Sequence, residues 1–146
     1  MTGAPQPGTV LHAMATMEGF FEPDTRPARN NDPLDLIYGQ EAIEFGAIAN
    51  QNGQSVFPDA DTGWNAGRRW LSVPAHLLYN DEEYAAFPVP GRKLVGGYLN
   101  AQLVEIINRF APGSQKGNNP QAYVSGVCAL CPGVTPQTVI TAELLG

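Results

Sequence analysis

Proline and glycine are spread along the whole chain and limit the length of every regular element. The 146 residues include 16 Gly and 13 Pro, and these residues tend to interrupt helices and strands. Short helices joined by turns are therefore expected instead of a long-helix bundle. The chain is long enough to bury a core without disulfide or metal staples. We predict a single domain over residues 1–146, with residues 1–8 as a flexible lead.

The first helix is predicted to be capped by Thr9 or by the turn before it and to run to about Glu18. Apolar residues recur along it at three- and four-residue steps, as Val10, Leu11, Met14 and Met17. Gly19 suits the left-handed residue that ends a helix, and Phe20-Phe21 then places apolar surface beside Glu18. Aromatic neighbours and the helix C-terminus both disfavour an ionised carboxylate, as a general acid requires near neutral pH. A solvated last-turn residue is the other interpretation of Glu18.

A small antiparallel sheet is predicted after this helix. Asn52-Gly53 suits a tight turn with positive φ at both central positions, and it is flanked by residues 47–49 and 55–57. Leu34–Tyr38 is a further short strand, whereas the polar segment Glu22–Pro33 is expected to be irregular. Helices then follow, so the order of elements predicts an α+β fold with a cleft between sheet and helices.

Capping residues mark the later helices. The predicted caps are Asp61 or Thr62, Asn100, Asn119 followed by Pro120, and Thr135 followed by Pro136. The expected apolar faces are Trp64, Gly67 and Leu71; then Leu103, Ile106, Ile107 and Phe110; then Tyr123, Val127 and Leu130. We expect the tryptophan on the first of these faces to lie in the core.

Charge and hydropathy disfavour two classes of partner. The net charge is −6, and the eight Lys and Arg residues are scattered, which does not match the basic surface of a nucleic-acid-binding protein. No segment has the length of a membrane span, and the N-terminus lacks the features of a signal peptide. We therefore expect synthesis in the cytoplasm and export, if any, by lysis, on a particle or through a dedicated secretion machine.

The two cysteines form an isolated Cys128-Ala129-Leu130-Cys131 motif at the end of a helical pattern. A redox motif would instead open a helix, where the dipole lowers the thiol pKa. Zinc would need two more ligands, and His12 and His76 do not have metal-site spacing. We expect no metal and no cofactor.

Four phrases in the sequence, taken in order, resemble one protein family. They are Met17-Glu18-Gly19-Phe20, then Arg29-Asn30-Asn31-Asp32-Pro33, then Phe57-Pro58-Asp59 followed by Thr62-Gly63-Trp64, and then Ile106-Ile107-Asn108-Arg109-Phe110-Ala111-Pro112 with Tyr123 further on. The chain resembles small phage and bacterial lysozyme-like proteins of the muramidase or lytic transglycosylase type, over roughly Val10–Cys128. The resemblance implies a lysozyme-like α+β fold. It also implies cleavage of the MurNAc–GlcNAc bond in the glycan strand of peptidoglycan, at the cell wall or in the periplasm.

By the same resemblance Glu18 matches the general acid. Glycosidases usually add a second carboxylate as base or nucleophile, and the candidates are Asp32 and Asp35, or Asp24 nearer to Glu18. Asp32 is equally suited to an Asx-turn onto its own backbone. A lytic transglycosylase needs only one carboxylate, because the muramyl hydroxyl attacks internally.

Sugar binding requires planar apolar faces together with amide or hydroxyl groups. The candidates in loops or at helix starts are Asn30, Asn31, Tyr38, Asn118 and Tyr123.

Two other hypotheses remain beside the enzyme. The chain has Leu34 where the family has Gly, and Gly117 where related chains have an acidic residue. These differences motivate a phage-particle or wall-binding structural protein that keeps the fold without turnover. A thiol redox protein would require an exposed Cys128 with a low pKa.

Overall fold

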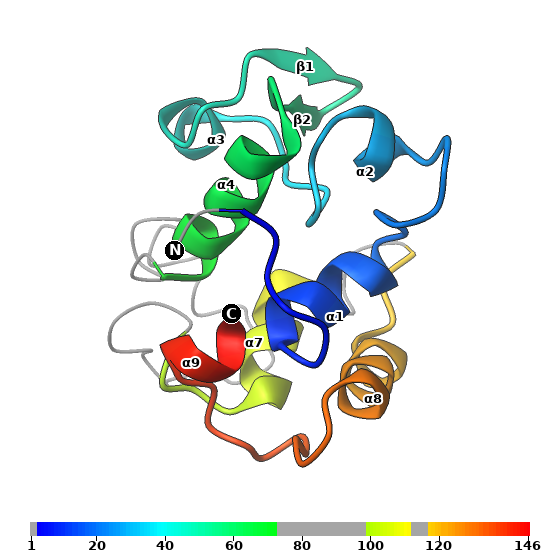
Figure 1. Cartoon of the computed structure of the whole chain (residues 1–146), viewed down its shortest axis with the longest axis vertical. Helices are drawn as coiled ribbons and strands as arrows, with labels where there is room; N and C mark the ends of the chain where they lie inside the picture. Colours follow the sequence, from blue (N-terminus) through cyan, green and yellow to red (C-terminus); the bar gives the residue numbers. More distant parts are fainter. Residues whose placement is uncertain (1–2, 73–98, 112–116) are drawn as a thin grey trace. The chain divides into compact units, whose positions relative to one another are not determined.

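The computed structural model describes residues 3–72, 99–111 and 117–146, which form two compact units. The first unit comprises Met1–Trp70 and Gly146, and the second comprises Leu71–Leu145. Several short helices and one two-stranded antiparallel sheet give a mixed α+β chain, as predicted (Figure 1). Among the residues described, no helix is long and apolar enough to cross a bilayer. The single domain over residues 1–146 stays a prediction.

Helix α1 spans Val10–Met17 in the first unit. Val10, Leu11 and Met14 are fully buried, as their spacing predicts. Met17, however, is 39% exposed, so its predicted place in the core is wrong. The last turn of α1 reaches the surface, and the small residues Ala13 and Ala15 complete the buried face instead.

The predicted hairpin is confirmed, although its strands lie closer to the turn than the predicted residues 47–49 and 55–57. Strands β1 (Ala49–Gln51) and β2 (Gln54–Val56) are antiparallel, with Gln51 opposite Gln54. Asn52 and Gly53 have φ values of 52° and 94°, the positive values that a two-residue turn with matching strand twist requires. The hairpin therefore follows from its two central residues.

The segment before the hairpin lies along β2 without forming a full strand. The Ser55 N–H donates to the Leu36 carbonyl at 2.8 Å, and the Tyr38 N–H donates to the Gly53 carbonyl at 2.9 Å. Only Ile37 forms a bridge with Gln54. The strand predicted over residues 34–38 is thus reduced to an isolated bridge.

Two short helices stand on either side of this segment. Helix α2 spans Arg26–Arg29, and α3 spans Gln40–Glu44. The irregular structure predicted for the polar segment is wrong at α2. Thr25 caps this helix by accepting a bond from the Ala28 N–H at 3.4 Å, and Pro27 lies in its first turn, where proline is tolerated.

Helix α4 spans Ala60–Ser72. Its predicted caps are wrong, because Asp59 caps it: one Asp59 carboxyl oxygen accepts from both the Thr62 N–H and the Thr62 hydroxyl at 2.7 Å. Its predicted inner face is confirmed, since Trp64 and Leu71 are 2% and 1% exposed.

Two glycines on α4 determine how closely its neighbours approach. A Cβ at Gly63 would lie 1.8 Å from the Asn31 backbone oxygen. A Cβ at Gly67 would lie 3.2 Å from Leu34 Cδ1 and 3.4 Å from Leu11 Cδ1. The first contact is with backbone and the second with flexible side chains. Gly63 therefore allows the loop after α2 to lie directly against α4.

The second unit contains α7 (Leu103–Phe110), α8 (Pro120–Leu130) and α9 (Ala142–Leu145), and α7 contacts α8. Gln102 forms a bridge with Val139. The core of this unit includes Leu103, Ile106, Ile107, Val127 and Ile140, each 0–1% exposed.

Helix starts in the second unit confirm one prediction and correct two. Asn119 caps α8 by accepting from the Ala122 N–H at 3.1 Å, as expected. Helix α7 begins after Gln102 and not Asn100, and the last helix begins at Ala142 and not near Thr135, because the intervening segment pairs with residues 100–103.

The apolar faces of α7 and α8 also differ from prediction at two positions. Phe110 is half-buried, so it belongs only partly to the inner face of α7. Leu130 is 41% exposed and lies outside the core. Val124, which is 5% exposed, joins Val127 on the inner face of α8 in its place.

Gly63→Ala is expected to lower the free energy of unfolding by about 3 kcal/mol, because backbone must move to admit the methyl group. Gly67→Ala should cost about 1 kcal/mol or less, since Leu34 can rotate. Urea unfolding of both variants would measure the difference. Asn65→Ala, at an exposed α4 position, is the control, and equal losses at the two glycines would contradict the close approach at Gly63.

Candidate active site

Glu18 is the C-terminal cap of α1 and is half-buried. The helix ends in a Schellman motif: the Gly19 N–H donates to the Thr16 carbonyl at 3.1 Å, and the Phe20 N–H donates to the Ala15 carbonyl at 3.0 Å. Gly19 has a φ of 84°, the left-handed conformation predicted for it. The backbone at Glu18 is therefore held by the hydrogen bonds that end the helix.

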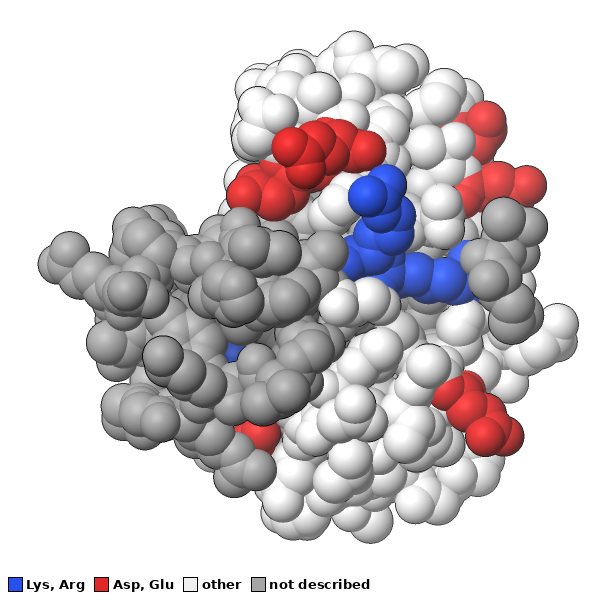
Figure 2. Space-filling view, turned by 90° about the vertical axis from the view of Figure 1, so that its left-hand side faces the viewer, with Lys and Arg blue, Asp and Glu red and all other residues white. Residues whose placement is uncertain are grey.

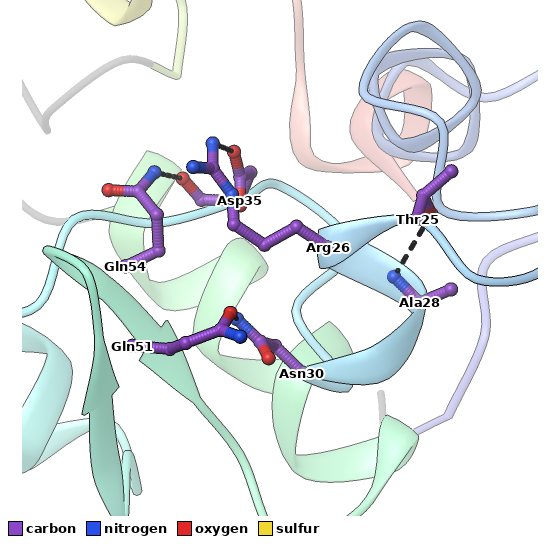
Figure 3. Close-up of polar contacts among 7 residues, drawn as sticks. All are labelled: Thr25, Arg26, Ala28, Asn30, Asp35, Gln51 and Gln54. Carbon is purple, nitrogen blue, oxygen red and sulfur yellow. Dashed lines mark hydrogen bonds and ion pairs between the residues drawn. The ribbon is translucent and has the colours of Figure 1, made fainter.

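Thr25 connects this helix end to α2. Its hydroxyl donates to the Gly19 carbonyl at 2.8 Å, while its oxygen also accepts the capping bond of α2. Arg26 follows directly and forms an ion pair with Asp35 (Figure 3). Two hydrogen bonds join the side chains: Arg26 Nε donates to Asp35 Oδ1 at 2.9 Å, and Arg26 Nη2 donates to Asp35 Oδ2. Asp35 is thus held in the fork geometry that an arginine offers a carboxylate.

The loop between α2 and Asp35 is tied to the hairpin by amide side chains. Asn30 Nδ2 donates to Gln51 Oε1 at 3.0 Å, and Gln54 Nε2 donates to the Asp35 carbonyl at 2.8 Å (Figure 3). Asn31 Nδ2 donates to the Phe57 carbonyl at 3.2 Å. These bonds use one donor group of each asparagine to position the loop.

The loop backbone suits the residues that it contains. Asn31 and Asp35 both have a φ of 52°, a conformation that Asn and Asp adopt more readily than other side chains. Leu34 is not among the residues with positive φ; it is 1% exposed and packs in the core. Leu34 therefore causes no backbone strain here.

Asp32 is fully buried, with 0% of its surface exposed. Within the described part of the chain, neither of its carboxyl oxygens forms a hydrogen bond of regular geometry. Its own carbonyl accepts from the Asp35 N–H at 3.0 Å in a turn with Pro33, but the side chain makes no Asx-turn bond. The Asx-turn, which the sequence offers as the alternative to a catalytic role for Asp32, is therefore not formed.

Desolvation raises the pKa of Asp32 from 3.8 to about 8. The Leu36 backbone N–H and the Arg26 charge lower the pKa in part, while the negative charges of Asp35 and Glu18 raise it further. Burial outweighs the nearby cation, so the Asp32 carboxyl is protonated at neutral pH. A strongly shifted carboxyl is a common feature of functional sites.

Glu18, Arg26, Asp32 and Asp35 form one electrostatic cluster, which we call the carboxyl cluster. The charge of Glu18 acts on both Asp32 and Arg26. These four residues span positions 18 to 35 of the sequence. Helix α2 and its capping residue Thr25 connect the end of α1, where Glu18 lies, to the loop that contains Asp32 and Asp35. Glu18 and Asp35 are thus both close enough to Asp32 to act on its charge.

The other predicted residues lie in different surroundings. Asp24 is exposed, and its carbonyl accepts from the Arg29 guanidinium. Tyr38 is half-buried beside β2. Asn118 and Tyr123 belong to the second unit, where the Tyr123 ring lies edge-on to Phe110 with centroids 6.2 Å apart. Their sugar-binding roles, and the cleft itself, stay predictions.

Arg26 is the residue of this cluster that sequence reasoning missed. It lies in the segment expected to be irregular, where its partner cannot be known from spacing. The signal that could have found it is Thr25-Arg26-Pro27, a cap followed by a first-turn proline. The same device was recognised correctly at Asn119-Pro120.

The cysteines have none of the properties of a redox pair. Both are free thiols at the end of α8; Cys128 is half-buried and Cys131 is buried. Burial raises the pKa of each thiol, which disfavours the reactive thiolate. The exposed, low-pKa Cys128 that a redox function would require is not observed.

Charges on the surface are interspersed. Figure 2 shows most of the visible Lys and Arg atoms in one group, a small basic patch among the grey atoms, and Asp and Glu side chains in several separate places.

Comparison of the chain with protein-family models, with curated proteins and with solved structures finds no significant match.

The buried Asp32 carboxyl predicts a specific pH dependence of stability. Its pKa is higher in the folded protein, about 8, than the ordinary 3.8, so the folded state holds a proton that the unfolded state has lost between these values. Stability from this group is complete below about pH 4 and falls by up to ~1.4 kcal/mol per unit until about pH 8. Asp32→Asn should remove this slope.

Urea unfolding from pH 4 to pH 8 measures how the free energy of unfolding changes with pH in the wild type and in Asp32→Asn. Asp61→Asn, the same substitution at an exposed position, should keep the wild-type slope. If Asp32→Asn keeps it as well, the carboxyl is ionised in the folded protein and the pKa assignment fails.

Proposed function

We propose that this protein cleaves the glycan strand of bacterial peptidoglycan, with Glu18 as the general acid in a lysozyme-like fold. Three features support the proposal. The chain resembles lysozyme-like proteins in four ordered phrases, its helix α1 ends at Glu18-Gly19 as in that family, and Glu18 belongs to the carboxyl cluster. The last of these carries the proposal, because a group of carboxyls that includes one with a strongly shifted pKa is a candidate functional site.

Accessibility distinguishes the three carboxyls. Asp32 is fully buried and protonated at neutral pH, so it cannot reach a substrate as an ionised base. Asp35 is held in two contacts by Arg26. Glu18 is half-buried at a helix end, and it is therefore the member of the cluster that a substrate can approach.

This distribution favours the mechanism that needs one carboxylate. Glu18 would donate its proton to the oxygen of the leaving sugar as the glycosidic bond breaks. The muramyl hydroxyl would then attack the anomeric carbon and return its proton to the Glu18 carboxylate. The product would be an anhydromuramyl end, formed without a water molecule, as in a lytic transglycosylase. A muramidase would need a second carboxylate that is free to act.

The same observation supports a second candidate. Asp32 is buried and Asp35 is paired with Arg26, so two of the three predicted catalytic carboxyls have structural surroundings. A phage-particle or wall-binding protein that keeps the fold without turnover would have the same arrangement. Such a protein would bind sacculi and release no fragments.

Glu18→Gln is expected to lower the rate of cell-wall lysis by about 10²–10⁴-fold, because the amide cannot protonate the leaving oxygen. Loss of turbidity of a sacculus suspension measures the rate, and thermal unfolding checks that the variant is folded. Glu22→Gln, the same substitution at an exposed position four residues along, should lyse as the wild type does. Unchanged lysis by folded Glu18→Gln would remove the mechanism.

Mass spectrometry of digested sacculi distinguishes the chemistry. We expect muropeptides that end in anhydromuramic acid, since the accessible part of the cluster offers a single carboxylate. Reducing ends would instead indicate hydrolysis, and Asp35 would then become the first candidate for the second carboxylate. Sacculi that bind the protein and release no muropeptides would favour the non-catalytic candidate.

A further inference from the structure

Phe21 is an exposed aromatic ring that is nevertheless held by other rings. It is 49% exposed. The His12 ring stacks on it with centroids 4.6 Å apart and planes inclined by 27°. Phe20 lies edge-on at 5.3 Å, and Trp64 is tilted at 6.0 Å. An exposed ring that its neighbours already hold in place can cover an apolar face of a ligand without first being ordered.

One of the rings that hold Phe21 is itself anchored in the core of the first unit. Trp64 is 2% exposed and pairs edge-on with Phe20 at 5.1 Å. The turn that carries both phenylalanines is closed by the Glu22 N–H, which donates to the Gly19 carbonyl at 3.0 Å. Phe21 therefore loses little conformational freedom when a ligand covers it, which favours binding.

We propose that Phe21, backed by His12, is a stacking platform for one pyranose ring of the glycan strand, next to Glu18. This inference rests on the proposed function and adds a binding residue to it. The C–H face of a sugar ring is apolar, and its hydroxyls point outward. A flat aromatic ring can therefore cover the C–H face while the hydroxyls stay solvated. Phe21 is three residues after Glu18, so their Cα atoms are at most about 11 Å apart. One oligosaccharide can therefore contact both residues.

The charge of the platform fits a neutral ligand. Burial lowers the pKa of His12, so at neutral pH the imidazole and the phenyl ring form an uncharged stack. N-acetylglucosamine is also uncharged, whereas an anionic ligand would gain nothing from this surface. The N-acetylglucosamine residues of the glycan strand are accordingly the expected occupants.

Binding of the tetramer of N-acetylglucosamine tests the platform. Titration calorimetry with the full chain should give about tenfold weaker binding for Phe21→Ala than for the wild type. Phe21→Trp, which keeps a flat ring, should bind within about twofold of the wild type. Ile48→Ala is the matched control, because Ile48 is an exposed apolar residue of the same unit, 65% exposed beside β1, and it should leave the affinity unchanged.

Each outcome bears on the platform separately from the catalytic proposal. Equal affinity of Phe21→Ala and wild type, or a wild type that does not bind the tetramer, overturns the platform. A change of oligomeric state in Phe21→Ala with unchanged tetramer binding also overturns it and assigns the ring to a contact between copies of the chain. Loss of tetramer binding in Phe21→Ala supports the platform. If the wild type then also fails to release muropeptides, the platform stands and the enzymatic proposal fails.

Discussion

The close approach of helix α4 to the Asn31 backbone is the constraint on which the rest of the first unit depends. Only a residue without a Cβ fits where Gly63 faces the Asn31 carbonyl. Leu34 then packs over Gly67, and the asparagine side chains of the loop reach the hairpin. Helix, loop and hairpin are thereby fixed together, and Asp32 is enclosed between them because it lies in the middle of the loop.

Enclosing Asp32 has an electrostatic consequence. A buried carboxyl without regular hydrogen bonds is much less costly when neutral than when ionised. The Arg26 charge acts in the opposite direction but is mainly engaged by Asp35. The cluster therefore contains a protonated carboxyl, an ion pair and Glu18 within one loop and one helix end.

The surroundings of Glu18 connect this cluster to function. The Schellman motif and the Thr25 hydroxyl fix the turn after Glu18, and the aromatic rings of that turn are held by Trp64 and His12. A half-buried carboxyl is thus placed between a charged loop and an apolar surface. Such a combination is suited to a carbohydrate, which presents hydroxyls and C–H faces together, and it is compatible with an enzyme as well as with a wall-binding protein.

The sequence by itself determined the features that depend on neighbouring residues. Asn52-Gly53 specifies the hairpin, Gly19 ends the first helix, and Asn119-Pro120 begins α8, because each depends on backbone conformations and bonds within a few positions. Only the tertiary structure decided that Asp32 is buried, that Arg26 pairs with Asp35, and that Met17 is exposed. These properties depend on which distant segments exclude water from a side chain, and neither desolvation nor the partner of a charge can be read from local spacing.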